Sequence, residues 1–151
     1  MTDSAGVLGD VSIETLINKS PLFQNLDDAG RKRLLEGGTL ENYMPGDVIM
    51  KEGEPGDAFF FLKTGAVEVA TLRNGEKLKL ADLAAGDFFG EVSVITAQPR
   101  TATVIAVSPV VAVKFQRRKI SRVLMDYPDV TRLLNAKIEE RAAETIQKML
   151  K

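Results

Sequence analysis

The sequence predicts an α+β domain, mainly β, in which helices precede and follow a strand-rich centre. Two observations predict this order. Apolar residues recur at helical spacing near both ends of the chain, over residues 11–36 and 117–149. Between them, from residue 39 to residue 115, short runs of β-branched and aromatic residues are separated by Gly, Pro, Asn and Asp turn signals. Helices grouped at the two ends of a run of strands are typical of α+β domains.

Length and composition indicate a single soluble domain. We expect residues 1–10 to form a disordered lead-in and residues 11–151 to form one domain. The net charge of −1 gives no general attraction to nucleic acid or anionic lipid. No apolar run approaches the ~20 residues of a membrane span, and the first ten residues lack the basic and apolar regions of a signal peptide. We therefore expect a cytoplasmic protein.

The chain contains no Cys and no His. Disulfides, thiol nucleophiles and thiolate metal sites are thereby excluded, and the commonest metal ligand and general base is missing. A carboxylate-only metal site would need clustered acidic residues, which the strand runs do not offer. The sequence therefore predicts neither an enzyme nor a metal cofactor, although the interior of the strand-rich part can still hold an organic ligand.

The first helical region divides into two helices, over residues 11–18 and 27–36. Ser20 and Pro21 separate them, and Asp27 is a suitable N-cap for the second. The glycines at 37 and 38 end that helix before the strands begin.

The central region contains seven clear β-rich runs, over residues 39–43, 47–51, 58–62, 66–72, 77–83, 101–107 and 110–115. Asn74-Gly75 is the strongest hairpin signal, because a type I′ turn needs positive φ at both central residues. A Gly-Asp pair stands just before a strand three times, which we interpret as turn chemistry rather than as a phosphate loop. These runs are compatible with a sandwich, a jelly roll or a barrel.

Two helices are predicted after the strands, over residues 117–125 and 129–151, with a break at Tyr127-Pro128. The second carries an apolar stripe that can pack on the strands, on a bound ligand, or on another copy of the chain in a weak homodimer; it consists of Leu134, Ile138, Ala142, Ile146 and Met149. The first carries a basic group that we interpret as a solvated helix face rather than as a nucleic-acid patch; it consists of Arg117, Arg118, Lys119 and Arg122.

Residues 88–104, FFGEVSVITAQPRTATV, contain the strongest functional signal. A short helix over residues 90–96 would direct free N–H groups and a positive dipole end at an anion, with Gly90 allowing close approach. Arg100 adds a five-donor group that suits phosphate. Glu91 would be repelled by a phosphate, so we assign it to a sugar hydroxyl. Taken singly, Glu91 and Arg100 would more often be surface charges or partners of each other; together they favour a nucleotide site.

The same residues carry a family resemblance. FGE, an eight-residue gap and RTATV resemble the phosphate-binding cassette of cyclic-nucleotide-binding domains, which occur in catabolite activator-type transcription factors, kinase regulatory subunits and cyclic-nucleotide-gated channels. The segments SPLFQNL at 20–26, PGDVIMKEGEPGDAFFFLKTGAVEV at 45–69 and AAGDFFGE at 84–91 extend the resemblance from about Leu16 to about Arg141. It implies an eight-stranded antiparallel β-roll, of jelly-roll type, with N-terminal and C-terminal helices.

The resemblance also implies residue roles at the phosphate and the ribose. The backbone amides of Gly90, Glu91 and Val92 should face the cyclic phosphate, and Arg100 should pair with it. The Glu91 carboxylate should bind the ribose 2′-hydroxyl. Thr101 should contact the phosphate or the purine edge.

For the purine, the resemblance implies an apolar wall made of Val69, Ala81 and Leu83. In channel-type relatives an arginine of the last helix can cap the base, and Arg141 is the residue that would do so here. The alternative for Arg141 is a solvated position within the charged run at 137–141. An apolar wall offers no partner for guanine O6 and N1–H, so we expect cAMP to be favoured over cGMP.

The sequence thus predicts a sensor of cyclic nucleotide, without another cofactor, that transmits occupancy through its C-terminal helices to a protein partner or a fused effector. The alternative is a ligand-independent structural or interaction module that has kept the fold. Direct DNA binding is not expected, because no helix-turn-helix follows the last helix before Lys151.

Overall fold

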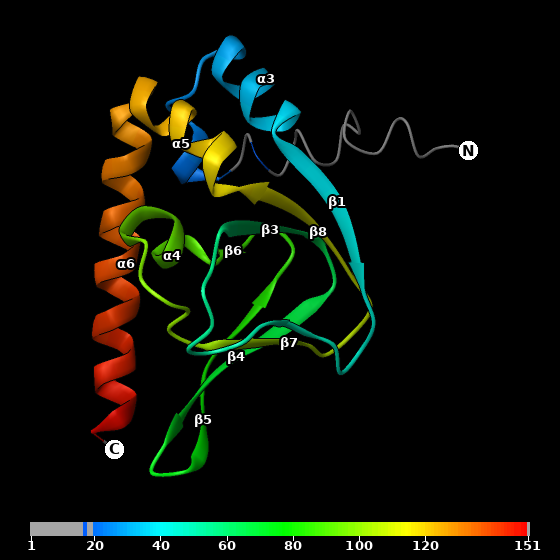
Figure 1. Ribbon diagram of the computed structural model, residues 1–151, viewed down its shortest axis with the longest axis vertical. Coiled ribbons are helices and arrows are strands. Elements are labelled where there is room, and N and C mark those ends of the chain that lie inside the picture. Colours follow the sequence, from blue (N-terminus) through cyan, green and yellow to red (C-terminus); the bar gives the residue numbers. More distant parts are fainter. Residues whose placement is uncertain (1–16, 18–19, 151) are drawn as a thin grey trace.

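The computed structural model describes residue 17 and residues 20–150. Its centre consists of two four-stranded antiparallel sheets (Figure 1). The first has the order β1 (Gly38–Tyr43), β8 (Val110–Gln116), β3 (Ala58–Thr64), β6 (Phe88–Phe89). The second has the order β2 (Val48–Met50), β7 (Thr103–Ala106), β4 (Ala66–Arg73), β5 (Glu76–Ala84). The eight-stranded antiparallel β-roll expected from the sequence is confirmed, and the two-residue β6, which lies outside the seven β-rich runs, is the strand that ends just before Gly90.

The helices are η1 (Pro21–Phe23), α3 (Asp28–Glu36), α4 (Glu91–Thr96), α5 (Arg117–Asp126) and α6 (Pro128–Met149). Figure 1 shows α3 and α5 at one end of the roll, while α6 runs along its side, past α4, toward the β4–β5 hairpin. The lead-in at 1–10 and most of the helix expected at 11–18 lie outside the described residues. Within the described part of the chain, no helix has the length and apolar character needed to cross a membrane.

The predicted hairpin turn and the predicted helix N-cap are both present in the structure. Asn74 and Gly75 have φ values of 54° and 80° and join β4 to β5, which confirms the hairpin. The Asp27 carboxylate accepts a hydrogen bond from the Gly30 amide at 2.7 Å, which confirms the N-cap of α3. The strand expected from residue 101 begins only at Thr103, because the backbone of Arg100 is hydrogen-bonded to the loop between β2 and β3.

The run Phe59-Phe60-Phe61 on β3 is buried on both faces of its sheet, because each face covers a separate part of the core. Phe59 and Phe61 pack with the helices in a cluster that includes Phe23, Phe88, Phe115, Ile120 and Leu134. Phe60 lies in a second cluster with Val67, Phe89, Val104 and Ala112, contributed by both sheets. The segment that leads into α4 is therefore held by core on two sides.

The apolar stripe expected along α6 holds only in its first half. Leu134 is 1% exposed, but Ile146 is 57% exposed. Farther along the helix, Arg141, Thr145, Lys148 and Met149 are half-buried, and Lys148 Nζ donates to the carbonyl of Leu80 on β5. In the second half of α6, polar side chains therefore make the hydrogen bonds to the roll: Arg141 and Lys148 satisfy polar groups of α4, β6 and β5 that apolar residues would leave unpaired.

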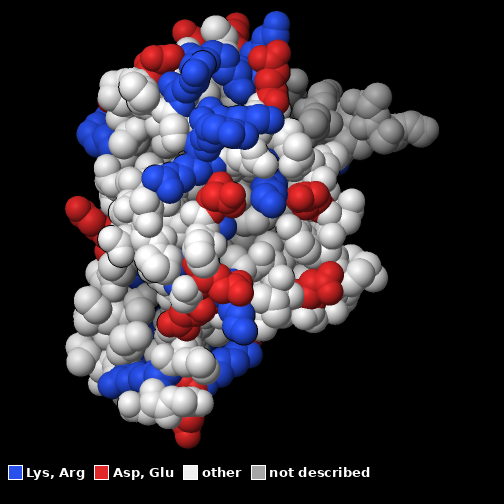
Figure 2. All heavy atoms as spheres, viewed as in Figure 1, with Lys and Arg blue, Asp and Glu red and all other residues white. Residues whose placement is uncertain are grey.

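The basic group of α5 is exposed at all four positions, which agrees with a solvated helix face. Figure 2 shows Lys and Arg side chains gathered at the end of the molecule that α3 and α5 form.

Candidate functional site

The site begins at the junction of β6 and α4. Gly90 is the N-cap of α4 and has a φ of 86°, in the left-handed region that favours glycine. A Cβ atom at this position would lie 2.9 Å from the Ala58 carbonyl oxygen and 3.0 Å from Arg100 Nη1. Conformation and space therefore both require glycine here, and α4 starts at Glu91, one residue after the start expected from the sequence.

Arg100 lies against this junction and is 7% exposed. Its Nη1 donates to the Gly90 carbonyl at 3.2 Å. Its backbone is fixed by the loop between β2 and β3: its amide donates to the Glu54 carbonyl at 2.8 Å, and its carbonyl accepts from the Gly53 amide at 2.9 Å. Residues 53 and 54, which sequence reasoning treated as part of a turn alone, therefore belong to the site. Their signals in the sequence were the clustering of Gly, Pro and Asp at 53–57 and their place in the segment 45–69 that carries the family resemblance.

The charge of Arg100 has no direct partner among the described residues. Burial lowers the pKa of its guanidinium, and the nearby carboxylates of Asp57 and Glu91 act in the opposite direction. Arginine remains protonated in either case. The side chain is thus a buried cation whose one hydrogen bond to a described residue ends on a neutral carbonyl.

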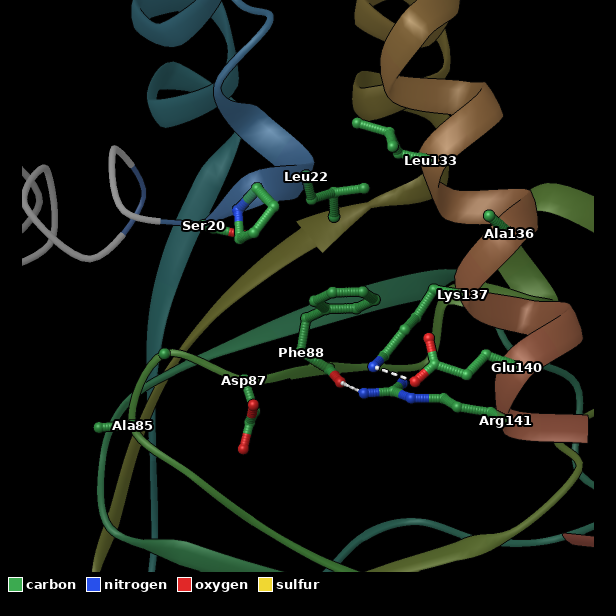
Figure 3. Close-up of a pocket in the computed structure, with 12 residues that line it drawn as sticks. Ser20, Leu22, Ala85, Asp87, Phe88, Leu133, Ala136, Lys137, Glu140 and Arg141 are labelled. Atoms are coloured by element: carbon green, nitrogen blue, oxygen red, sulfur yellow. Dashed lines mark hydrogen bonds and ion pairs between the residues drawn. The ribbon is translucent and has the colours of Figure 1, made fainter. Parts of the chain in front are cut away.

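Glu91 is 3% exposed and lies in an ion pair with α6. Arg141 Nη1 donates to both of its carboxylate oxygens, at 2.8 and 2.6 Å, and Nη2 donates to the Phe88 carbonyl at 2.8 Å. The Arg141 guanidinium also stacks over the Phe88 ring, 4.8 Å from its centroid, and Figure 3 shows it reaching from α6 to Phe88. Arg141 is therefore not a solvated helix side chain: it fastens α6 to the start of α4.

The expected wall residues lie together on the second sheet. Val69 on β4 is opposite Ala81 on β5 and opposite Val104 on β7. Val69 and Leu83 pack against the core cluster between the sheets, and Ala81 is half-buried. Thr101 is exposed and follows Arg100 directly, in the bend before β7. The fold therefore brings each predicted residue class to a defined place, and their roles toward a ligand remain predictions.

A cavity of about 620 Å³ lies beside Phe88 and Arg141, between η1, the turn before β6, and α6 (Figure 3). Phe88 and Arg141 line it, together with Ser20, Leu133 and Lys137. Glu91 and Arg100 do not line it. It therefore lies next to the arrangement of Gly90 and Arg100 and is separate from it.

Comparison with known proteins identifies relatives along most of the chain. Residues 40–127 match the family model described as cyclic nucleotide-binding domain. The cAMP-dependent protein kinase regulatory subunit of Blastocladiella emersonii is 33% identical over 130 residues, which are 85% of this chain and 32% of the relative. The matched part of the chain spans 23% to 32% of the length of such curated relatives.

Two solved structures show the same architecture. The Thermus thermophilus catabolite activator protein has a TM-score of 0.75 and 27% identity, over 86% of this chain and 62% of that one. The regulatory subunit of a cAMP-independent protein kinase A from Trypanosoma cruzi, bound to guanosine, has a TM-score of 0.80 over 96% of this chain and 52% of that one. Its sequence identity is 24%, so the similarity shows a shared fold only. With the family model spanning the whole segment from Gly90 to Arg100, the chain belongs to the cyclic nucleotide-binding domain family.

Proposed function

We propose that this domain binds a cyclic mononucleotide, with cAMP favoured over cGMP, and acts as a regulatory sensor. The observation that carries the proposal is Arg100, a cation that is 7% exposed and has no ion pair among the described residues. A buried charge is costly unless an opposite charge compensates it. A cyclic phosphate at the start of α4 would do so. The chain is similar to cAMP-dependent protein kinase regulatory subunits, which supports a cyclic nucleotide as the ligand.

The remaining contacts follow from the positions of the backbone and of Glu91. The amides of Gly90, Glu91 and Val92 belong to the N-terminal turn of α4, where backbone N–H groups have no partner inside the helix. They would face the phosphate, and the absence of a Cβ on Gly90 lets the ligand approach. The Glu91 carboxylate has further lone pairs beside those that Arg141 uses, and one would accept the ribose 2′-hydroxyl.

The base would lie on Val69, Ala81 and Leu83. These side chains offer no partner to guanine O6 and N1–H, and an unpaired buried polar group costs about 1–3 kcal/mol. The Thr101 hydroxyl can partly compensate by meeting the guanine 2-amino group. We therefore expect cAMP to bind about tenfold more tightly than cGMP, which is roughly 1.4 kcal/mol. The solved T. cruzi relative with guanosine makes guanine the competitor to test.

Transmission would pass through α6. Glu91 serves both the proposed ribose contact and the docking of α6 through Arg141, so ligand and helix share one carboxylate. A ligand shifts such an equilibrium only by its different affinity for the two states. A protein partner or a fused effector that contacts the C-terminal helices would receive the signal.

A ligand-independent interaction module is the second candidate, and one observation favours it. Arg141 already occupies both oxygens of Glu91, so α6 docks on α4 through protein groups alone. In that case the fold would present a fixed surface.

Calorimetric titration with cAMP and cGMP separates the two candidates. The sensor predicts heat at micromolar nucleotide, and the interaction module predicts none for either nucleotide. Arg100→Ala should weaken cAMP binding by about 30- to 3,000-fold, because truncating one partner of a buried charge pair costs about 2–5 kcal/mol. Arg118→Ala, at an exposed position of α5, is the control and should bind as the wild type does. A loss below about fivefold for Arg100→Ala, with unchanged circular dichroism, would remove Arg100 from the phosphate.

A further inference from the structure

Arg100 lies in a slot between two glycines from different parts of the chain. A Cβ atom on Gly56, in the loop between β2 and β3, would lie 2.5 Å from Arg100 Cζ and 2.6 Å from Cδ, and closer still to Nε. A Cβ atom on Gly90 would lie 3.0 Å from Nη1. No real Cβ atom makes the first contacts, so any side chain at residue 56 would displace the guanidinium.

The requirement for glycine at residue 56 is one of space and not of backbone conformation. Among the glycines of the described residues, six have positive φ, and Gly56 is not one of them. Gly53, in the same loop, is the opposite case: its φ is +87°, but nothing lies within 4 Å of a Cβ built on it. The φ of residue 56 therefore does not oppose alanine, and the three atoms that a Cβ there would approach most closely all belong to Arg100.

The Arg100 side chain can relieve such a clash only by moving its guanidinium away from its observed position. Its backbone is bonded on both sides to the same loop, through Gly53 and Glu54, so loop and strand entrance move together. The clash would fall on the middle of the side chain, at Cδ, Nε and Cζ, and not on a free end. The far end is held at the Gly90 carbonyl at 3.2 Å. The displacement would therefore carry the guanidinium away from the start of α4.

We infer that Gly56 is a positioning residue for anion recognition: its bare Cα forms the wall that holds the Arg100 guanidinium at the first turn of α4. Gly56 touches no ligand and acts only through Arg100. The inference rests on the proposed function in taking the anion to be the cyclic phosphate.

The test is a double-mutant cycle in cAMP affinity. Gly56→Ala should weaken cAMP binding by about tenfold or more in the wild-type background. In the Arg100→Ala background it should weaken cAMP binding by less than about twofold, because the new methyl group then meets no guanidinium. Adenosine, which lacks the phosphate, should bind Gly56→Ala as it binds the wild type. Gly37→Ala is the matched control: its φ is −85°, and its nearest contact would be an ordinary 3.4 Å. Equal losses in both backgrounds, or wild-type affinity in Gly56→Ala, would overturn the inference.

Unfolding by urea, without nucleotide, tests the slot independently of the proposed function. Gly56→Ala should destabilise the protein when Arg100 is present and have little effect when Arg100 is replaced by Ala; failure to fold in the first background only would be the same result in stronger form. If the wild type binds no cyclic nucleotide, the proposed function fails, while this coupling still decides about the slot. Additive effects on unfolding would refute the slot even where cAMP binds.

Discussion

Replacement of Arg141 by Ala tests the attachment of α6 to the site. Glu91 is 3% exposed, the Arg141 side chain is 25% exposed, and Nη1 lies 2.6 and 2.8 Å from the two carboxylate oxygens. Removing one partner of a buried ion pair costs about 3–5 kcal/mol, because the other charge stays buried without compensation. Since part of Arg141 is in contact with solvent, which screens the pair, we expect a loss of about 2 kcal/mol in the free energy of unfolding.

Urea denaturation without nucleotide measures this loss, and calorimetry should show a decrease in Tm of about 4–8 °C for a chain of this size. The same helix provides the control. Arg132 pairs with Asp129 at 2.9 Å, with side chains 68% and 61% exposed, so Arg132→Ala should cost at most about 0.5 kcal/mol.

A second substitution makes the reasoning refutable. In the Arg141→Ala background, Glu91→Gln should recover part of the stability, because the buried carboxylate charge that has lost its partner is then removed. The two substitutions should therefore be coupled. Equal effects of Arg141→Ala and Arg132→Ala, or additivity of the Glu91 and Arg141 substitutions within about 0.5 kcal/mol, would mean that the pair does not hold α6 in place.

Three other results are expected. Glu91→Gln should weaken cAMP more than 2′-deoxy-cAMP, by about 1.5–3 kcal/mol for a lost hydrogen bond to a charged acceptor; equal losses in titrations would remove Glu91 from the ribose. Thr101→Ala should weaken cGMP selectively in competition titrations, and an equal effect on both nucleotides would contradict the assigned contact. The Tyr127 hydroxyl, 2.6 Å from Asp27, lowers the pKa of that carboxyl, so its stabilisation is present above the unfolded value of about 4 and is lost as the pH falls through the folded value. Thermal melts of Tyr127→Phe should accordingly show a lower Tm near neutral pH and a smaller decrease in acid than the wild type shows.

The features that the sequence determined by itself are those with local causes. Asn74-Gly75 sets its own hairpin because both residues tolerate positive φ, and Tyr127-Pro128 ends one helix because proline cannot continue it. The segment from Gly90 to Arg100 could be predicted as a candidate anion site because a glycine, a carboxylate and a guanidinium stand close together in the sequence. Each of these depends on neighbours within about ten positions, and residue types there are sufficient evidence.

The features that only the tertiary structure decided join distant segments. Periodicity predicted an apolar inner face along α6, but Ile146 is exposed, and Arg141 contacts Glu91 across 50 positions. Glycine at 56 could be read as a turn residue, whereas the fold places it against the side chain of Arg100. The physical reason is common to both cases. Which side chain meets which depends on how the helices and loops pack on the two sheets, and a buried charge selects its partner from whatever that packing brings within reach.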